Sequence, residues 1–123
     1  EGFFTENAFV IGSVGRMTEV KNFPGLIDIV DLRTLFPLDE DLIFSTVKTH
    51  GKCLVITEEQ KNNSFAEALA GRISKTCFTF LDAPVEVLGA VDLPAVPLNM
   101  GLEAAMLPNA DKVARRLQEL LRF

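Results

Sequence analysis

The sequence predicts an α/β fold, in which helices cover a parallel β-sheet. Short apolar segments alternate with amphipathic segments of helical period along the 123 residues, as in sheets whose strands are joined by helices. One apolar segment, Cys53–Thr57, is uninterrupted, which is typical of a strand buried on both faces. The length allows one domain with a core of ordinary size, so residues 1–123 are interpreted as a single domain.

Two further strands are predicted before Cys53. Residues Ala8–Val14 form an apolar run that Gly15 closes, and the β-branched run Leu26–Leu32 follows a Pro-Gly pair. The connection between them, Gly15–Gly25, is short, because a parallel crossover usually needs about ten to twelve residues or more with its helix. Either this crossover is unusually abbreviated, or the sequence omits a segment at this point.

Two helices are predicted on either side of Cys53–Thr57. Asp39 is a good N-cap for the first, and Gly51 is a typical terminator. The second helix is capped by Asn62–Ser64 and runs to about Thr76. This order of strands and helices fits a parallel sheet with helical connections.

The last third of the chain is more irregular. Residues Phe78–Leu81 and Val85–Leu88 are interpreted as short strands. The proline-bearing stretch Asp92–Pro108 has one expected helical turn at Gly101–Ala105, and Asn109 caps a final amphipathic helix. The apolar face of that helix is carried by Val113, Leu117, Leu120 and Leu121.

Composition excludes some classes of partner. The formal charge is −5, from 12 basic and 17 acidic residues, so neither nucleic acid nor an anionic membrane is expected to bind. No apolar run is as long as a membrane span, and the N-terminus lacks the layout of a signal peptide. Cys53 and Cys77 are interpreted as reduced, half-buried thiols of a cytoplasmic protein, with a disulfide between them left open. The chain begins at Glu1 rather than Met, so we expect either a processed product or a fragment of a longer chain.

The search for catalytic, cofactor-binding and metal-binding residues predicts none. The single histidine, His50, falls at a helix C-terminus and is interpreted as a solvent-facing residue there. The glycines form neither a dinucleotide-binding motif nor a P-loop. The basic pair Arg115-Arg116 is interpreted as part of a solvated helix face.

Two pairs of charged residues are candidates for an interface or a structural ion pair. Glu58 and Glu59 follow the third strand, where ligand crevices of doubly wound sheets lie. They are suited to a cation or a base, but acids that cap a loop or pair across an interface are the favoured interpretation. Asp31 and Arg33 follow the second strand and are expected to form an ion pair that fixes the next turn. The alternative for Arg33 is a phosphate or carboxylate ligand.

These residues carry a resemblance to a known family. Residues Asp31–Asp39 (DLRTLFPLD) closely resemble the signature of the transketolase C-terminal domain, in the variant found in beta chains of thiamine-diphosphate-dependent 2-oxo acid dehydrogenases. The resemblance extends from about Ile27 to the last helix. Further matching segments are Val47-Lys48, Gly51-Lys52, Thr57–Glu59, Leu81–Val85, Asp92–Leu98, Leu102-Glu103 and Leu107–Asn109.

The resemblance implies a three-layer sandwich, with a mainly parallel sheet, one antiparallel strand and helices on both faces. It implies a parent enzyme that decarboxylates a 2-oxo acid of pyruvate or branched-chain type and transfers the acyl group to lipoyl-lysine. Thiamine diphosphate and Mg²⁺ are expected on other domains of that parent, so this fragment is expected to hold no cofactor and not to be catalytic. Its implied partners are the other subunits of the dehydrogenase, a second copy in a homodimer, and the binding domain of the lipoyl acyltransferase.

Two alternatives remain open from the sequence. One is the C-terminal domain of transketolase or deoxyxylulose-phosphate synthase, which would share the fold. The other is a free-standing flavodoxin-like domain that binds a small ligand beside Glu58 and Glu59. Binding of a nucleotide or flavin by the isolated domain would favour the second alternative.

Overall fold

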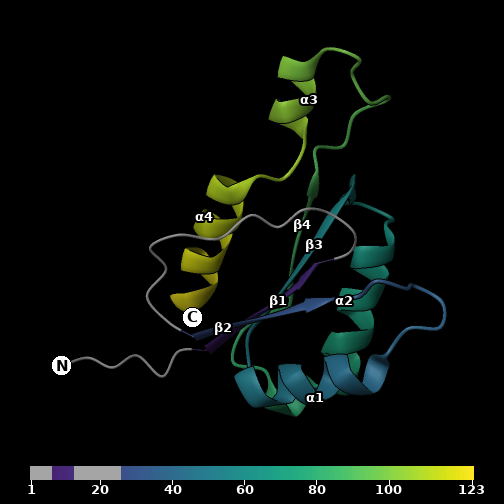
Figure 1. The fold of residues 1–123 in the computed structure, drawn as a ribbon. Coiled ribbons are helices and arrows are strands. Elements are labelled where there is room, and N and C mark those ends of the chain that lie inside the picture. The colour runs from purple at the N-terminus through teal and green to yellow at the C-terminus, as the bar shows by residue number, and fades with distance from the viewer. Residues whose placement is uncertain (1–6, 13–25) are drawn as a thin grey trace.

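The structure, a computed structural model, describes residues 7–12 and 26–123. Four strands form one sheet in the order β2-β1-β3-β4 (Figure 1). They are β1 (Asn7–Gly12), β2 (Leu26–Asp31), β3 (Cys53–Gln60) and β4 (Glu86–Ala90). Every neighbouring pair is parallel, which confirms the predicted class of sheet. The expected antiparallel strand is not among these four, and the short crossover at residues 15–25 lies outside the described residues.

The strand order places a switch point inside the sheet. The chain passes from β1 to β2 on one side, and β3 then pairs with the other side of β1. Because all four strands are parallel, their carboxyl ends lie at one edge, which we call the carboxyl edge. In doubly wound sheets this edge, next to the switch point, is where ligands usually bind.

Two helices cover one face of the sheet, α1 (Glu40–His50) and α2 (Phe65–Thr76). The side chains of Asp39 and Ser64 cap them, and Gly51 ends α1 with a left-handed φ of 76°, as the sequence predicts. Their apolar stripes meet the face of β3 that carries Val55. The buried residues of this layer are Leu32, Ile43, Val47, Cys53, Val55, Ala66, Leu69, Ala70, Ile73, Cys77 and Val87.

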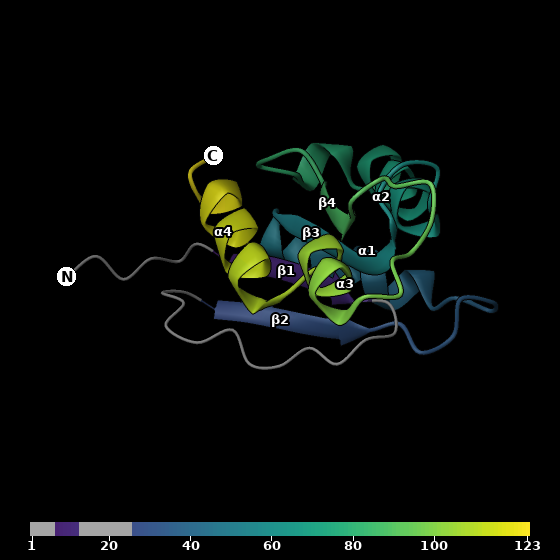
Figure 2. The same cartoon turned by 90° about the horizontal axis from the view of Figure 1, so that it is seen from above.

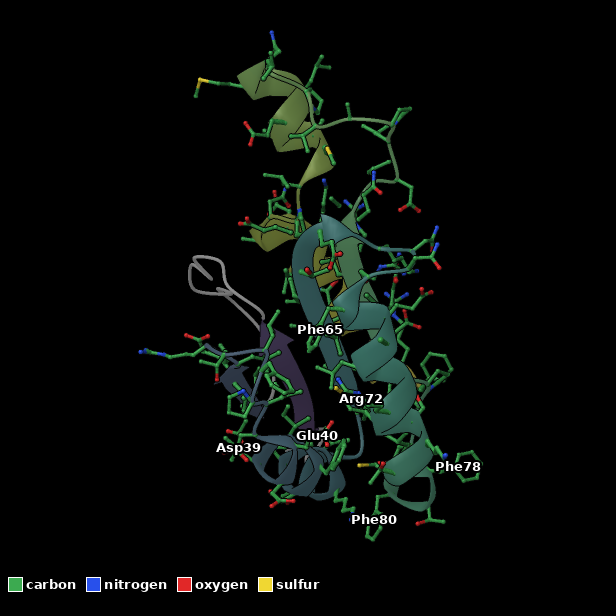
Figure 3. The ribbon with its side chains drawn as sticks, turned by 90° about the vertical axis from the view of Figure 1, so that its right-hand side faces the viewer. Asp39, Glu40, Phe65, Arg72, Phe78 and Phe80 are labelled. Atoms are coloured by element: carbon green, nitrogen blue, oxygen red, sulfur yellow. The ribbon has the colours of Figure 1, made fainter. Side chains whose placement is uncertain are left out.

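A polar contact joins the outer surfaces of these two helices (Figure 3). Arg72 Nη1 of α2 lies 2.5 Å from Glu40 Oε1 of α1. The guanidinium of Arg72 also lies over the ring of Phe65, 5.7 Å from its centroid, within the range of a cation–π contact. Both partners of the ion pair are part-exposed, so the pair aligns the helices more than it stabilises them.

The opposite face is covered by α4 (Ala110–Leu121). Leu54 and Ile56 of β3 point to this side and pack against Leu117 and Leu120. At the end of the helix, the buried Lys52 donates from Nζ to the carbonyl of Leu121, at 3.3 Å. Figures 1 and 2 show α4 on one side of the strands and α1 and α2 on the other, which confirms the three-layer architecture.

Two predicted elements differ from the structure. Residues Phe78–Phe80 form a 3-10 helix, η1, rather than a strand. The reason is that Leu81 N donates to the carbonyl of Phe78 within the same turn, and the Phe78 and Phe80 rings face solvent instead of a sheet neighbour (Figure 3). Strand β3 continues past Thr57 to Gln60, because a shift of register lets Gln60 pair with Ala90.

The shift of register brings the backbones of β3 and β4 very close together. A side chain at Gly89 would place its Cβ 2.8 Å from the carbonyl oxygen of Glu59 and 2.9 Å from the backbone of Lys61. Only glycine fits this approach. The pairing therefore fixes where the chain leaves β4 at the carboxyl edge.

Candidate functional site

Asp31 and Arg33 lie at the carboxyl end of β2. The backbone N–H of Arg33 donates to Asp31 Oδ1 at 3.1 Å, and its Nε lies 3.3 Å from Asp31 Oδ2. Arg33 adopts a left-handed φ of 54°, a conformation that few non-glycine residues take. Both side chains are largely exposed, so their ion pair shapes the turn and contributes little stability.

Glu58 and Glu59 lie near the carboxyl end of strand β3, and both are exposed. Glu59 Oε2 accepts a hydrogen bond from Phe65 N at the start of α2, at 3.2 Å. A carboxylate in this position is favoured by the helix dipole. The side chain of Glu58 has no hydrogen bond or ion pair with any residue that the structure describes, and it is the more available acid of the two.

The structure does not bring the two pairs together. They share the carboxyl edge, but β1 lies between β2 and β3, which separates the pairs by about 10 Å. No hydrogen bond or ion pair joins them in residues 26–123. Their role at an interface stays a prediction.

The carboxyl edge also carries exposed apolar side chains. After β2, Leu35 and Phe36 precede the next helix, and Phe36 is 96% exposed. After β4, residues 91–106 form a projecting segment that ends in α3 (Met100–Met106) (Figure 1). We call this segment the apolar arm. Its exposed apolar residues are Val91, Leu93, Val96, Leu98, Met100 and Leu102.

The apolar arm is held in place although its side chains face solvent. Its two ends meet, since Val91 N donates to the carbonyl of Met106 at 3.1 Å. Asp92 accepts hydrogen bonds from Asn62, and Gln60 donates to the carbonyl of Leu93. An ordered segment with Leu98 fully exposed and Met100 85% exposed is typical of a surface that another protein covers.

One contact differs from the sequence-based expectation. His50 is buried rather than solvent-facing, and its side chain is 2% exposed. Its Nε2 lies 2.5 Å from Asp28 Oδ2 on β2, so a strand and the end of α1 are joined there. The signal for this partner was present in the sequence, because Asp28 interrupts an otherwise apolar strand.

The two thiols are free and more deeply buried than expected. Cys53 and Cys77 are both inaccessible to solvent and form no disulfide. Burial raises the pKa of the Cys53 thiol far above its ordinary value, and the neighbouring Cys77 adds to this. Burial also raises the pKa of Cys77, which Lys48 partly opposes. Both thiols are therefore protonated core residues rather than nucleophiles.

Other kinds of site find no support in the described part of the chain. No three His, Cys, Asp or Glu side chains gather there in an arrangement that could hold a metal ion. Within the same residues, no helix combines the length and apolarity needed to cross a membrane. The feature that distinguishes the carboxyl edge is thus its exposed apolar surface.

The fold is a doubly wound α/β domain with helices on both faces of a parallel sheet. Residues 26–113 match the family described as transketolase, C-terminal domain. The chain belongs to this family, and the resemblance found in its motifs is confirmed.

Several proteins similar to this chain are named as beta subunits of dehydrogenases. The chain is 39% identical over 95 residues to the 2-oxoisovalerate dehydrogenase subunit beta of Bacillus subtilis, a match that covers 77% of this chain and 29% of the relative. It is 34% identical over 93 residues to the pyruvate dehydrogenase E1 component subunit beta of Rickettsia bellii, covering 76% and 28%. A 3-methyl-2-oxobutanoate dehydrogenase subunit beta of Mycobacterium tuberculosis is 33% identical over 96 residues, covering 78% and 27%. The matches span less than a third of these relatives.

Proposed function

We propose that this chain is the C-terminal assembly domain of the decarboxylating component of a 2-oxo acid dehydrogenase. The observation that carries the proposal is the apolar arm, which is ordered and exposed in a domain whose relatives are named as subunits. The substrate class is a 2-oxo acid of pyruvate or branched-chain type, as the names of the relatives suggest. We place the parent enzyme in the cytoplasm.

In this proposal the chemistry belongs to other parts of the parent enzyme. Thiamine diphosphate and Mg²⁺ would supply the decarboxylation there, and no residue of this chain is assigned to them. The domain itself is noncatalytic and forms contacts between subunits.

The apolar arm supplies the surface for another subunit of the dehydrogenase, including a second copy in a homodimer. It has few charges, and its side chains project beyond the body of the domain. Burying several of them on a partner would contribute about 25 cal/mol for each Å² of apolar surface removed from water. Methionine is enriched at protein interfaces, and the buried centre of an interface is more apolar than the rest of the protein surface.

The arm is tested in the intact subunit with the double variant Leu98→Ser/Met100→Ser. We expect its affinity for the other subunits to fall at least about tenfold, because both side chains are exposed in the isolated domain. The matched control is Phe78→Ser, a 75% exposed side chain on η1, away from the arm. Analytical ultracentrifugation of the reconstituted enzyme gives the comparison. Equal assembly by both variants would count against the proposal.

A second partner in this proposal is the binding domain of the lipoyl acyltransferase. The support is electrostatic, because exposed Asp31, Glu58 and Glu59 place carboxylates along the carboxyl edge of an acidic chain, and such a surface attracts a basic partner. Glu58→Gln should weaken a salt-sensitive complex with that binding domain. Asp82→Asn is the control with the same change of charge, because Asp82 is exposed in the turn before β4 and its N–H donates to the carbonyl of Gly51 just before β3, at the opposite edge of the sheet. A complex insensitive to both salt and Glu58→Gln would contradict this role.

Among the alternatives, the relatives favour a dehydrogenase over transketolase or deoxyxylulose-phosphate synthase. The named relatives are beta subunits of oxo acid dehydrogenases. A free-standing flavodoxin-like ligand binder is supported less, because the carboxyl edge presents the apolar arm and Phe36 to solvent. Tight binding of flavin or nucleotide at Glu58 and Glu59 would reverse this preference.

A further inference from the structure

A cavity lies between α4 and the outer strand β4, beside the base of the arm, and neither candidate pair lines it. Its volume is about 290 Å³. Leu88 of β4 lines it, and the other lining residues lie on α4 at helical spacing, so they share one face of the helix. These residues are Lys112, Arg115, Arg116 and Glu119.

The three cationic side chains of this cavity differ in how many of their N–H groups already bind protein acceptors. Lys112 Nζ donates to the carbonyls of Ala105 and Leu107, both at 2.7 Å, which fixes it and leaves one N–H. Arg116 pairs with Glu119 through one nitrogen, at 3.3 Å. The guanidinium of Arg115 has no hydrogen bond or ion pair with the residues that the structure describes.

We propose that this cavity binds a compact phosphate group, as a phosphomonoester or as inorganic phosphate. The guanidinium of Arg115 supplies the free planar fork that suits phosphate oxygens. Lys112 adds a positive charge held in place by the end of α3, and Arg116 keeps part of its donor set beside Glu119.

The charge and size of the cavity favour this class of ligand. Three cations face one carboxylate, and the resulting positive excess matches a phosphomonoester, which carries about −1.5 to −2 at pH 7. The volume is just below the usual range for sites that enclose a drug-sized ligand, so a small anion fits better than a large one. The net charge of the cavity lining is positive, whereas the formal charge of the whole chain is −5.

The test is a titration of the full chain with inorganic phosphate and, separately, with glycerol 3-phosphate in a phosphate-free buffer. Amide shifts in ¹H–¹⁵N spectra should saturate and centre on α4 and β4. Arg115→Gln should weaken the binding at least about tenfold. The matched control is Arg122→Gln, which removes the same charge from the exposed end of α4 outside the cavity and should change the affinity less than about twofold.

Each outcome decides the proposal. Saturable binding of either probe that depends on Arg115 supports it, and the probe that binds more tightly identifies free or esterified phosphate as the source. Amide shifts that do not saturate would overturn the proposal. So would an equal loss of affinity in Arg115→Gln and Arg122→Gln. Succinate binding with the same affinity and the same dependence on Arg115 also overturns the assignment to phosphate.

Discussion

The contact between His50 and Asp28 shows how one polar pair can join two elements. The imidazole is almost fully buried, and the carboxylate is half exposed, so water reaches the acid but not the ring. Loss of the acid would remove a partner from a buried polar group, which costs more than loss of a surface ion pair. The pair is therefore a structural contact between β2 and the end of α1.

Asp28→Ala should lower the free energy of unfolding by about 1–3 kcal/mol. Asp31→Ala is the control on the same strand, because the side chains of Asp28 and Asp31 are 52% and 59% exposed. The control should cost less than about 1 kcal/mol. Urea denaturation measures both, and equal losses would show that the histidine contact has no special weight.

The buried Cys53 thiol makes stability depend on alkaline pH. Its pKa is raised in the folded protein by burial, whereas the unfolded chain releases the thiol proton at a pH of about 8.5. Above that pH the unfolded state binds fewer protons than the folded state, so the free energy of unfolding falls as pH rises. Urea denaturation between pH 8 and about 10 should show a steeper fall for the wild type than for Cys53→Ala. Parallel pH profiles would contradict this.

At the scale of elements, helix ends were predicted best. Asp39, Gly51, Ser64 and Asn109 act as the sequence indicates, because caps depend on local backbone chemistry. The predicted strand Phe78–Leu81 is wrong, because a short apolar run does not distinguish a strand from the helical turn found at Phe78–Phe80. The partner of His50 lies 22 positions away in sequence, and only tertiary structure brings the two together.

Ser64→Ala should lower the free energy of unfolding by about 1–2 kcal/mol. The buried Ser64 hydroxyl accepts a hydrogen bond from Glu67 N at 3.1 Å and donates to the carbonyl of Lys61 at 2.8 Å. Ser45→Ala removes the same group from the exposed side of α1 and should change stability by less than about 0.5 kcal/mol. Thermal and urea denaturation measure both variants. An equal loss of stability in Ser64→Ala and Ser45→Ala would contradict the role of Ser64 as the cap of α2.

At the scale of the whole molecule, the apolar residues fall into two groups, one in the buried core and one exposed on the arm. Leu117 on α4 is fully buried against the sheet, whereas Leu98 on the arm is fully exposed. The sequence predicted the first from the helical period of α4. In the arm the sequence predicts only one helical turn, at Gly101–Ala105, and two prolines separate the other apolar residues, so the exposure of Leu98 is seen only in the structure.

Leu117→Ala should therefore destabilise the domain by about 2–5 kcal/mol. The identical substitution Leu98→Ala should leave its free energy of unfolding within about 0.5 kcal/mol of the wild type. Chemical denaturation of the isolated chain compares them directly. A large loss for Leu98→Ala would show that the arm belongs to the folding core.

The closed base of the arm has a consequence for how such a domain can change. Because Val91 and Met106 are already hydrogen-bonded to each other, the residues between them form a detachable loop. A short turn could replace that loop at a small entropic cost, and the layers beneath would keep their packing. If the arm binds a partner as proposed, the residues that select the partner and the residues that form the core lie in separate stretches of the chain, and the first can diverge without unfolding the second.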